Sequence, residues 1–369
     1  MRAFIVAVIV GLGSLPRAIA WGAAGHEIVA TIAQSYLDPQ VLNTVCSILS
    51  SDPSVDQVRG DGAPCYLSTV ATWADKIRFR ARWSAQLHFI NGAGDHPPDD
   101  CRYPGPDGWQ GKERANVLDA VHNVSSILTD FAQGSSSSGA PELAQEALKF
   151  LIHFIGDMHQ PLHLTGRDRG GNSDKVHWDN RVTNLHSVWD SALIAKAIRL
   201  TPRNYTRPVA LPTLESSFRD AIYDPYIRRI IWEGFGSDQV SGRWGSEADS
   251  WLECPSPESA VAAQWAPQEV LAAPRKPRPR SGPPLTSDSD VICPYGWTAP
   301  IHKLNCDVVW PPELDNPETH GRAPRREYLE LDTPKYTGRI EKEWIVEKLL
   351  AQGGVRLAGI LNYIFAPQQ

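Results

Sequence analysis

The chain carries two His-x-x-x-Asp pairs with a third histidine between them. His153 and Asp157 form the first pair, His186 and Asp190 form the second, and His163 lies in between. Side chains four residues apart lie on the same face of a helix. The spacing therefore predicts helical segments that each present an imidazole and a carboxylate on one face.

Nitrogen and oxygen ligands without a thiolate suit a zinc ion. A single His/Asp pair is easily a surface or core accident, but two pairs and a further histidine in a chain with 11 histidines favour a metal site. Asp75 in Trp-Ala-Asp and His88 in Leu-His-Phe are two more candidate ligands. Each is uninformative alone, since Asp75 also suits a helix surface and His88 a core.

Hydrophobic residues recur at the spacing of three and four that is typical of helices. The clearest stretches are 27–37, 142–162 and 339–365, and Gly353-Gly354 is a candidate kink or break in the last one. The sequence has no convincing series of alternating strands and no solenoid repeat. We therefore expect a mainly α fold.

Residues 1–20 are predicted to be a secretory signal peptide, because a charged start and an apolar run precede a small-residue cleavage motif that ends at Ala20. No later stretch approaches the ~20 apolar residues of a membrane span. Cleavage after Ala20 would make Trp21 the first residue of a secreted chain. The free amine and the carbonyl of Trp21 could then bind a metal ion together with His26.

The chain is acidic, with a formal net charge of -6. This balance argues against a nucleic-acid binder that depends on bulk positive charge. If the substrate is anionic, positive charge must come from elsewhere, for example from bound metal. The length of the chain is enough for a large core or for more than one domain.

Six cysteines, an even count, favour disulfide bonds in a secreted chain. None of them lies in a Cys-x-x-Cys motif, which argues against a cysteine zinc site. Asn123 and Asn204 each begin an Asn-x-Ser/Thr sequon and are candidate glycosylation sites in an extracellular compartment.

Residues 267–330 differ in composition from the rest of the chain. The stretch Pro274–Pro284 holds five prolines and four basic residues, and a region rich in serine, aspartate and proline follows. We expect a long, irregular surface insertion, with a basic contact to substrate or cell wall as the alternative. Cys293 and Cys306 lie inside it, which favours a local disulfide.

The motifs together resemble the fungal single-strand-specific zinc nuclease family, whose superfamily includes bacterial zinc phospholipases C. The ordered motifs that carry the resemblance are Trp21-Gly22 with Gly25-His26, Trp73-Ala74-Asp75, Leu87-His88-Phe89-Ile90, His153-Phe154-Ile155-Gly156-Asp157-Met158 with Gln160-Pro161-Leu162-His163, Gly170-Gly171-Asn172, and Asn184-Leu185-His186 with Trp189-Asp190. The resemblance runs from Trp21 to about Cys254 and resumes near Thr333, so it leaves out the insertion. It implies a single, mainly helical domain over residues 21–369 with a trinuclear zinc cleft.

The resemblance implies three Zn2+ ions and assigns their ligands by motif. The groups are Asp75, His88, His153 and Asp157 for the first ion, His163, His186 and Asp190 for the second, and the Trp21 amine and carbonyl, His26 and Asp157 for the third. A water or hydroxide between the first and third ions would be the nucleophile. Arg78 resembles the family's phosphate-stabilising arginine, with a solvated helix arginine as the alternative. Asp75, Arg78 and Asp157 are therefore the expected catalytic residues.

The family's base pocket maps onto residues that depart in part from its pattern. Phe89 would stack a nucleobase, an interaction that tolerates any base and demands unpaired strands. Asn91 stands where the family commonly has an acid that reads the base edge, and Arg169 stands at a clamp position that is often apolar. Asn172 resembles a residue beside the site, with a turn asparagine as the alternative.

The same resemblance aligns Cys101 and Cys254 with a family disulfide. For the remaining cysteines, Cys46–Cys65 and Cys293–Cys306 are the pairings that are local in sequence. The sequence alone does not determine the connectivity of six cysteines.

The resemblance implies a secreted, monomeric, zinc-dependent phosphodiesterase with no stable protein partner and no membrane association. It would cut single-stranded DNA and RNA to products with 5′-phosphates and would remove 3′-phosphates from 3′-nucleotides. A zinc phospholipase C is the first alternative, but that branch usually ends its ligand series in glutamate where this chain has Asp190, and Phe89 suits a base better than a lipid. A secreted zinc-binding protein without turnover is the second alternative, and Arg78 argues against it.

Overall fold

The computed structural model describes most of the chain that follows the predicted signal peptide. The described residues are 21–53, 55, 64–134, 140–206, 212–237, 240–254, 288–289, 291–315 and 328–366. The predicted signal peptide lies outside them, as do residues 267–287, 290 and 316–327 of the predicted insertion. Helices dominate the described part, so the predicted mainly α class is confirmed.

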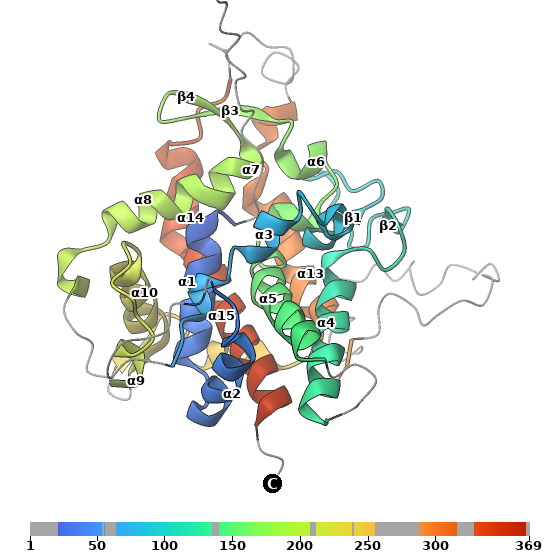
Figure 1. Cartoon of the computed structure of the whole chain (residues 1–369). Coiled ribbons are helices and arrows are strands. Elements are labelled where there is room, and N and C mark those ends of the chain that lie inside the picture. The colour runs from blue at the N-terminus through green and yellow to red at the C-terminus, as the bar shows by residue number, and fades with distance from the viewer. Residues whose placement is uncertain are drawn as a thin grey trace, which may run out of the picture.

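Three long helices form the centre of the molecule (Figure 1). Helix α1 (Ala23–Ser35) packs along α15 (Ile345–Phe365) and also contacts α5 (Pro141–Asp157). Helix α4 (Val117–Ala132) covers another side of α5, and α2 (Pro39–Leu49) lies against α15 and α5. Buried aliphatic and aromatic side chains from all of these helices make one continuous core.

The predicted kink at Gly353-Gly354 is wrong. Helix α15 runs unbroken through both glycines, and the chain turns instead at Trp344, whose φ of 56° lies in the left-handed region. Trp344 separates α15 from α14 (Pro334–Glu343). A Cβ atom at Gly354 would lie 2.4 Å from Cγ2 of Ile32. The glycines therefore permit the close contact of α15 with α1 rather than a bend.

Short helices and hairpins connect these long helices. The helical segments are η1 (Leu67–Thr69), α3 (Trp73–Ile77), η2 (Arg82–His88), η3 (Pro161–Leu164), α6 (Asp168–Gly171), α7 (Leu185–Ser187), η4 (Val188–Ala192), α8 (Leu193–Leu200), η5 (Arg203–Thr206), α9 (Pro212–Glu215), α10 (Asp224–Arg229), η6 (Ile230–Phe235), η7 (Gly245–Leu252), α13 (Pro294–Leu304), η8 (Asn305–Val309) and η9 (Pro312–Asp315). The antiparallel hairpins pair β1 (Asn91–Gly92) with β2 (Trp109–Gln110), β3 (Lys175–Trp178) with β4 (Arg181–Asn184), and β5 (Gly236–Ser237) with β6 (Val240–Ser241).

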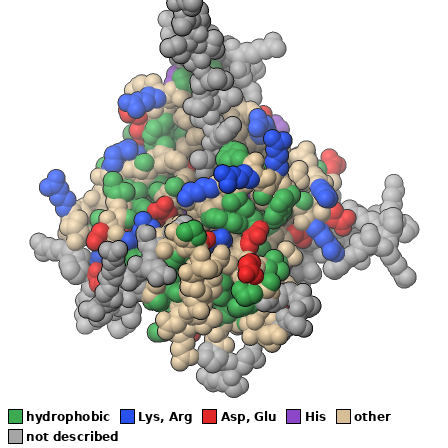
Figure 2. All heavy atoms as spheres, viewed as in Figure 1, with side chains coloured by type: hydrophobic (Ala, Val, Ile, Leu, Met, Phe, Trp, Pro, Cys, Tyr) green, Lys and Arg blue, Asp and Glu red, His purple; other side chains and the backbone are tan. Residues whose placement is uncertain are grey.

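Lys and Arg side chains gather near the middle of one face of the molecule, over α3, with hydrophobic side chains beside them (Figure 2). None of the described helices combines the length and the apolar character that a bilayer crossing requires.

Residues 291–315 contradict the expectation of an irregular insertion. They form α13, η8 and η9, and the Trp297 and Trp310 side chains are almost fully buried. Asn305 donates a hydrogen bond from Nδ2 to the Pro161 carbonyl over 2.8 Å, which ties this segment to η3. Although the neighbouring stretches are rich in proline and polar residues, this segment is anchored by Trp297 on α13 and by Trp310 after η8.

Two of the three expected disulfides are wrong. Cys46 is bonded to Cys65 as expected, but Cys101 is bonded to Cys306 and Cys254 to Cys293, in place of the expected Cys101–Cys254 and Cys293–Cys306 pairs. Cys293 caps the start of α13 and Cys306 lies just beyond its end. A helix of this length separates its ends by roughly 15 to 20 Å at 1.5 Å per residue, and a disulfide needs Cα atoms about 4.4–6.8 Å apart.

Candidate metal centre

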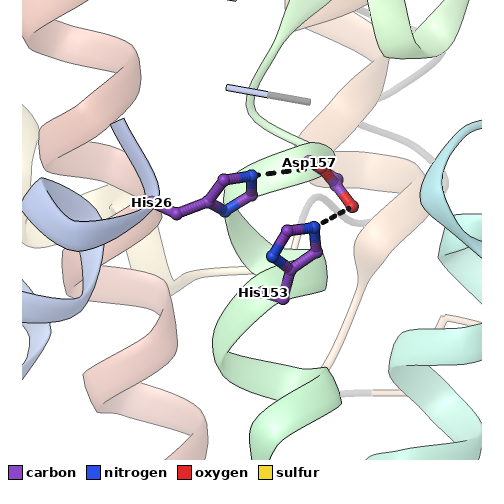
Figure 3. A group of neighbouring side chains, drawn as sticks. All are labelled: His26, His153 and Asp157. Atoms are coloured by element: carbon purple, nitrogen blue, oxygen red, sulfur yellow. Dashed lines mark ion pairs between the residues drawn. The ribbon is translucent and has the colours of Figure 1, made fainter. Parts of the chain in front are cut away.

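The predicted side-chain ligands meet in one buried cluster. They come from separate elements, and they are His26 on α1, Asp75 on α3, His88 at the end of η2, His153 and Asp157 on α5, His163 on η3, His186 on α7 and Asp190 on η4. The most exposed of them, Asp75, has only 6% of its surface accessible. Figure 3 shows how His26 reaches from α1 toward the end of α5, where His153 and Asp157 lie one turn apart.

Asp157 lies at the centre of the cluster. Its Oδ2 atom is 2.9 Å from Nδ1 of His88 and 3.3 Å from Nε2 of His153. Its Oδ1 atom is 3.5 Å from Nε2 of His26 and 3.6 Å from Nδ1 of His163. One carboxylate at the C-terminal end of α5 is thus surrounded by four imidazoles from four different elements.

Close packing of α1 on α5 depends on the residue next to Asp157. A Cβ atom at Gly156 would lie only 2.4 Å from Nδ1 of His26, nearer than nonbonded atoms approach each other. The rings of His26 and His153 stack with their centroids 3.8 Å apart and their planes 13° apart. The glycine therefore lets the His26 ring reach the cluster.

Within the cluster, three sets of side chains are close enough to bind a metal ion. They are His26, His153 and Asp157, then Asp75, His88 and His153, and then His163, His186 and Asp190, with the candidate ligand atoms of each set within 4.8 Å of one another. The third set matches the second group implied by the resemblance. His153 belongs to both of the other two sets. Asp157 belongs to the first of them, and its Oδ2 atom is 2.9 Å from Nδ1 of His88 in the second.

Hydrogen bonds orient three of the histidines. The Nδ1 atoms pair with backbone carbonyls, which are Ala71 for His153 (2.7 Å), His88 for His163 (2.6 Å) and Gly170 for His186 (2.6 Å). A neutral imidazole that donates from Nδ1 keeps a lone pair on Nε2. Such backbone contacts are the usual way in which a protein fixes the tautomer of a metal-binding histidine.

Buried polar atoms without a hydrogen-bond partner are concentrated in the cluster. In the part of the chain that the structure describes, they include both ring nitrogens of His26, Nε2 of His88 and His163, Oδ2 of Asp75 and Oδ1 of Asp157. A buried polar atom with no partner destabilises a fold. Lone pairs and negative oxygens that converge in this way fit a bound cation, and the mix of nitrogen and oxygen suits zinc.

Burial sets the protonation states that a cation would meet. It lowers the pKa of His88 and of His186 to about 4, so both rings are neutral near pH 7. It also raises the pKa of Asp157 and Asp190 well above the ordinary carboxyl value, because each carboxylate is removed from water. Neutral imidazoles have free lone pairs for a metal ion, and a cation would supply the positive charge that the buried carboxylates lack.

Two side chains near the cluster interact with its carboxylates. Nη1 of Arg78, one turn after Asp75, lies 3.1 Å from Oδ1 of that residue. Gln160 donates from Nε2 to Oδ1 of Asp190 over 2.6 Å and was missed by the sequence reasoning as a functional residue. No local feature of the sequence points to it, because the contact joins residues 30 apart in the chain.

The start of the described chain lies beside Asp190. The Trp21 side chain is fully buried, and the backbone N–H of Gly22 donates to the Asp190 carbonyl over 2.7 Å. The role predicted for the Trp21 amine depends on cleavage after Ala20, which lies outside the described residues. Trp21 as a metal ligand therefore stays a prediction.

The predicted base-binding residues lie next to the ligands in the chain. Phe89 follows His88 and leaves 38% of its surface exposed. The Asn91 side-chain amide lies against the carbonyl oxygens of Thr165 (3.1 Å) and Ile90 (3.2 Å), so its nitrogen faces them and its oxygen points the other way.

Arg169 and Asn172 lie in the turn before β3. Arg169 is exposed and has a φ of 61° in the left-handed region. Asn172 donates from Nδ2 to the Arg169 carbonyl over 2.8 Å. This contact is the turn role that was the alternative for Asn172, and it shapes the loop whose Gly170 carbonyl accepts a bond from His186.

Two further histidines near the motifs lie outside the ligand sets. His159 is fully buried, bonds through Nδ1 to the Ile155 carbonyl (2.7 Å), and pairs its Nε2 with Nη1 of Arg356 on α15 (2.8 Å). His177 in β3 pairs its Nδ1 with the Tyr328 carbonyl over 3.0 Å. Both rings have structural partners in the described part of the chain.

Comparison with known proteins identifies the family. A sequence model of the S1/P1 nuclease family matches residues 21–272. Endonuclease 2 of Arabidopsis thaliana is 29% identical over 358 residues, or 96% of this chain and 93% of that protein. Nuclease P1 of Penicillium citrinum is 39% identical over 182 residues, or 48% of this chain and 60% of that protein. Nuclease S1 of Aspergillus oryzae is 36% identical over 181 residues, or 48% of this chain and 55% of that protein. The chain belongs to the S1/P1 nuclease family.

Proposed function

We propose that the chain is a zinc-dependent endonuclease that hydrolyses phosphodiester bonds in single-stranded DNA and RNA. Its products would carry 5′-phosphates, and it would also remove 3′-phosphates from 3′-nucleotides. The observation that carries the proposal is the convergence of unpaired, buried nitrogen and oxygen atoms around Asp157 in a chain of this nuclease family. Zinc ions bound by these atoms would give an acidic protein a local positive site for a polyanionic substrate.

The proposed site holds three Zn2+ ions. Asp75, His88, His153 and Asp157 would hold the first, His163, His186 and Asp190 the second, and the Trp21 amine and carbonyl, His26 and Asp157 the third. The position of Asp157 among four imidazoles supports its shared role. The bond between Gly22 and Asp190 supports a metal role for the chain start, because it holds that segment beside the cluster.

When bound, zinc would lower the pKa of a water so that hydroxide is available to attack a phosphodiester near neutral pH, and it would offset the charge of the phosphate. The chain's own residues orient the substrate. Arg78 is partly buried and paired with Asp75, and its guanidinium would contact the phosphate oxygens as negative charge grows on them. Asp75 and Asp157 hold the arrangement by anchoring Arg78 and the histidines.

The exposed ring of Phe89 would stack a nucleobase next to the cluster. Stacking requires a base that is free of its complement, which supports a preference for single strands. Asn91, Arg169 and Asn172 would border this base, with the outward oxygen of Asn91 as an acceptor. These contacts distinguish a nucleotide from the lipid head group that a zinc phospholipase C would bind.

We further propose an extracellular, monomeric enzyme that begins at Trp21, without a stable protein partner and without membrane association. Asn123 on α4 and Asn204 in η5 are both exposed, so each is accessible to a glycan. A precursor that keeps residues 1–20 would carry an amide in place of the free amine at Trp21, and would bind the third ion weakly.

The test uses protein that begins at Trp21, assayed on single-stranded DNA, duplex DNA, RNA and phosphatidylcholine, before and after chelation and zinc addition. We expect cleavage of the single-stranded substrates alone, lost on chelation and restored by zinc. Hydrolysis of phosphatidylcholine without nucleic-acid cleavage would favour the phospholipase. Stoichiometric zinc binding without any turnover would favour the zinc-binding protein, and either result would overturn the proposal.

A further inference from the structure

We propose that Arg80, Arg82 and Trp83 form a track that holds the single strand adjoining the scissile phosphate. The inference rests on the proposed nuclease function and extends the substrate site beyond the nucleotide at the metal centre. We call these three residues the arginine–tryptophan track. It would bind several nucleotides by their backbone charge and by one further stacked base.

The track lies between two candidate metal ligands along the chain. Asp75 on α3 precedes it and His88 at the end of η2 follows it, and both side chains point into the buried cluster. The chain leaves the cluster after Asp75 and returns to it at His88. The segment that carries the track, which includes the start of η2, is therefore joined at both ends to residues of the cluster.

The tryptophan of the track is unusually accessible. Trp83 leaves 62% of its surface exposed, more than any other described tryptophan, whereas burying such a ring would normally stabilise the fold. Its contact with Phe150 is T-shaped, with the centroids 5.8 Å apart and the planes at 62°. That contact holds the ring in place and leaves most of its surface available for stacking.

The charge around the tryptophan is opposite to that of the whole chain. Residues 76–91 include four basic residues and no acidic residue, in a chain whose net charge is -6. Arg80 and Arg82 are exposed, and neither forms an ion pair with the residues that the structure describes. Figure 2 shows Lys and Arg side chains near the middle of this face, where Figure 1 places α3, with hydrophobic side chains beside them.

Arginines next to an exposed aromatic ring suit a single-stranded nucleic acid. Guanidinium groups contact the phosphates, and a base stacks on the ring without regard to its identity. A solvated helix face would explain the arginines but not the exposed indole that follows them in the chain. Phe89 offers a separate stacking position beside His88, so the two rings would engage different nucleotides of one strand.

Substrate length provides the test. We compare kcat/KM for a thymidine dinucleotide with that for an oligothymidine of about twelve nucleotides, a length within the range of single-strand sites. Trp83→Ala should lower the ratio of kcat/KM for the oligothymidine to kcat/KM for the dinucleotide about tenfold. Most of the change should be a higher KM for the oligothymidine. Arg80→Ala with Arg82→Ala should reduce the slope of log KM against log salt by roughly 0.7 for each lost phosphate contact.

Matched variants separate binding from folding. Trp232→Ala removes another exposed tryptophan, on η6, and should leave the ratio unchanged. Trp83→Phe retains a stacking ring and should restore most of the ratio. An equal loss on both substrates, or a ratio that Trp83→Ala does not change, would overturn the track.

The track can be tested even if the nuclease proposal fails. If the zinc-loaded wild type cleaves neither substrate, the proposed function is wrong, and fluorescence anisotropy of labelled oligothymidine then measures binding directly. Weaker binding by Trp83→Ala and by the double arginine variant, relative to Trp232→Ala, would support the track. Equal binding by all variants would rule it out.

Discussion

Two buried His/Asp groups in this protein differ in the number of imidazoles that surround the carboxylate. Around Asp157, four imidazoles approach one carboxylate and several of their nitrogen atoms lack a hydrogen-bond partner. Around Asp95, a single imidazole from α13, that of His302, bonds to the carboxylate over 3.0 Å and stacks on Tyr103. The first group is short of positive charge, whereas the second is a pair that joins α13 to the rest of the fold.

Distance alone would not separate the two groups. Asp95, Cys101 and His302 are also close enough to hold a metal ion. The sulfur of Cys101, however, is bonded to Cys306, so it cannot act as a thiolate ligand. Asp95 and His302 each keep one buried atom without a partner, but this group offers a single imidazole, against the four imidazoles around Asp157.

Asp157→Ala should have the largest effect. The change removes the carboxylate shared by two proposed ions, so we expect kcat to fall on the order of 10³-fold and the bound zinc to fall below the wild-type amount. Steady-state assays and elemental analysis of purified protein measure the two effects. Full zinc content with full activity would show that Asp157 is a structural acid like Asp95.

Removing metal from the group around Asp157 should destabilise the folded protein. A ligand present at 1,000 times its Kd stabilises the native state by about 4 kcal/mol, and chelation should remove a stabilisation of this order. Urea unfolding with chelator and with added zinc measures the difference. In Asp157→Ala the difference should shrink, and an undiminished difference would place the stabilising ion elsewhere.

Asp95→Ala should separate stability from metal binding. It leaves the His302 ring buried without its hydrogen-bond partner, and a buried polar group that loses its partner costs about 1–3 kcal/mol. We expect a lower free energy of unfolding and unchanged zinc content in the folded protein. A loss of zinc at a temperature where circular dichroism shows native helix would mean that the second group also binds metal.

Asn91→Asp should have the smallest effect on catalysis. A carboxylate there would favour guanine, whose edge presents adjacent N–H donors, and we expect relative kcat/KM among bases to shift by about tenfold or less. The bond to the Thr165 carbonyl would be lost, at a cost of about 1 kcal/mol in stability. Kinetics on homopolymeric strands measure the shift, and a loss of activity as large as that of Asp157→Ala would contradict its role.

The sequence predicted those parts of the site in which the residues lie within one helical turn of each other. His153 and Asp157 face the same way because they are four residues apart on one helix, and His186 and Asp190 keep that relation although their segment passes from α-helix to π-helix. Asp75 and His88 carried no such signal, and only the resemblance placed them in the site. Gln160 gave no usable signal, because its contact with Asp190 joins residues 30 apart.

The expectations that failed concern contacts between distant segments. Gly353-Gly354 reads as a break within its own helix, but its role is set by Ile32 on another helix. Cys101 and Cys306 are 205 residues apart, and no local rule brings them together. The composition around α13 indicates an irregular segment, whereas Trp297 and the more distant Trp310 are buried in the core of the folded chain.

By itself the sequence determined the helical class, the facing pairs of histidine and aspartate and, through ordered motifs, the nuclease family. Only the tertiary structure decided the disulfide connectivity, the burial of α13 and the convergence of ligands from separate elements on Asp157. The physical reason is range. Helix periodicity acts over a few residues, whereas a coordination site and a packed core depend on atoms that the folded chain brings within a few ångströms of one another.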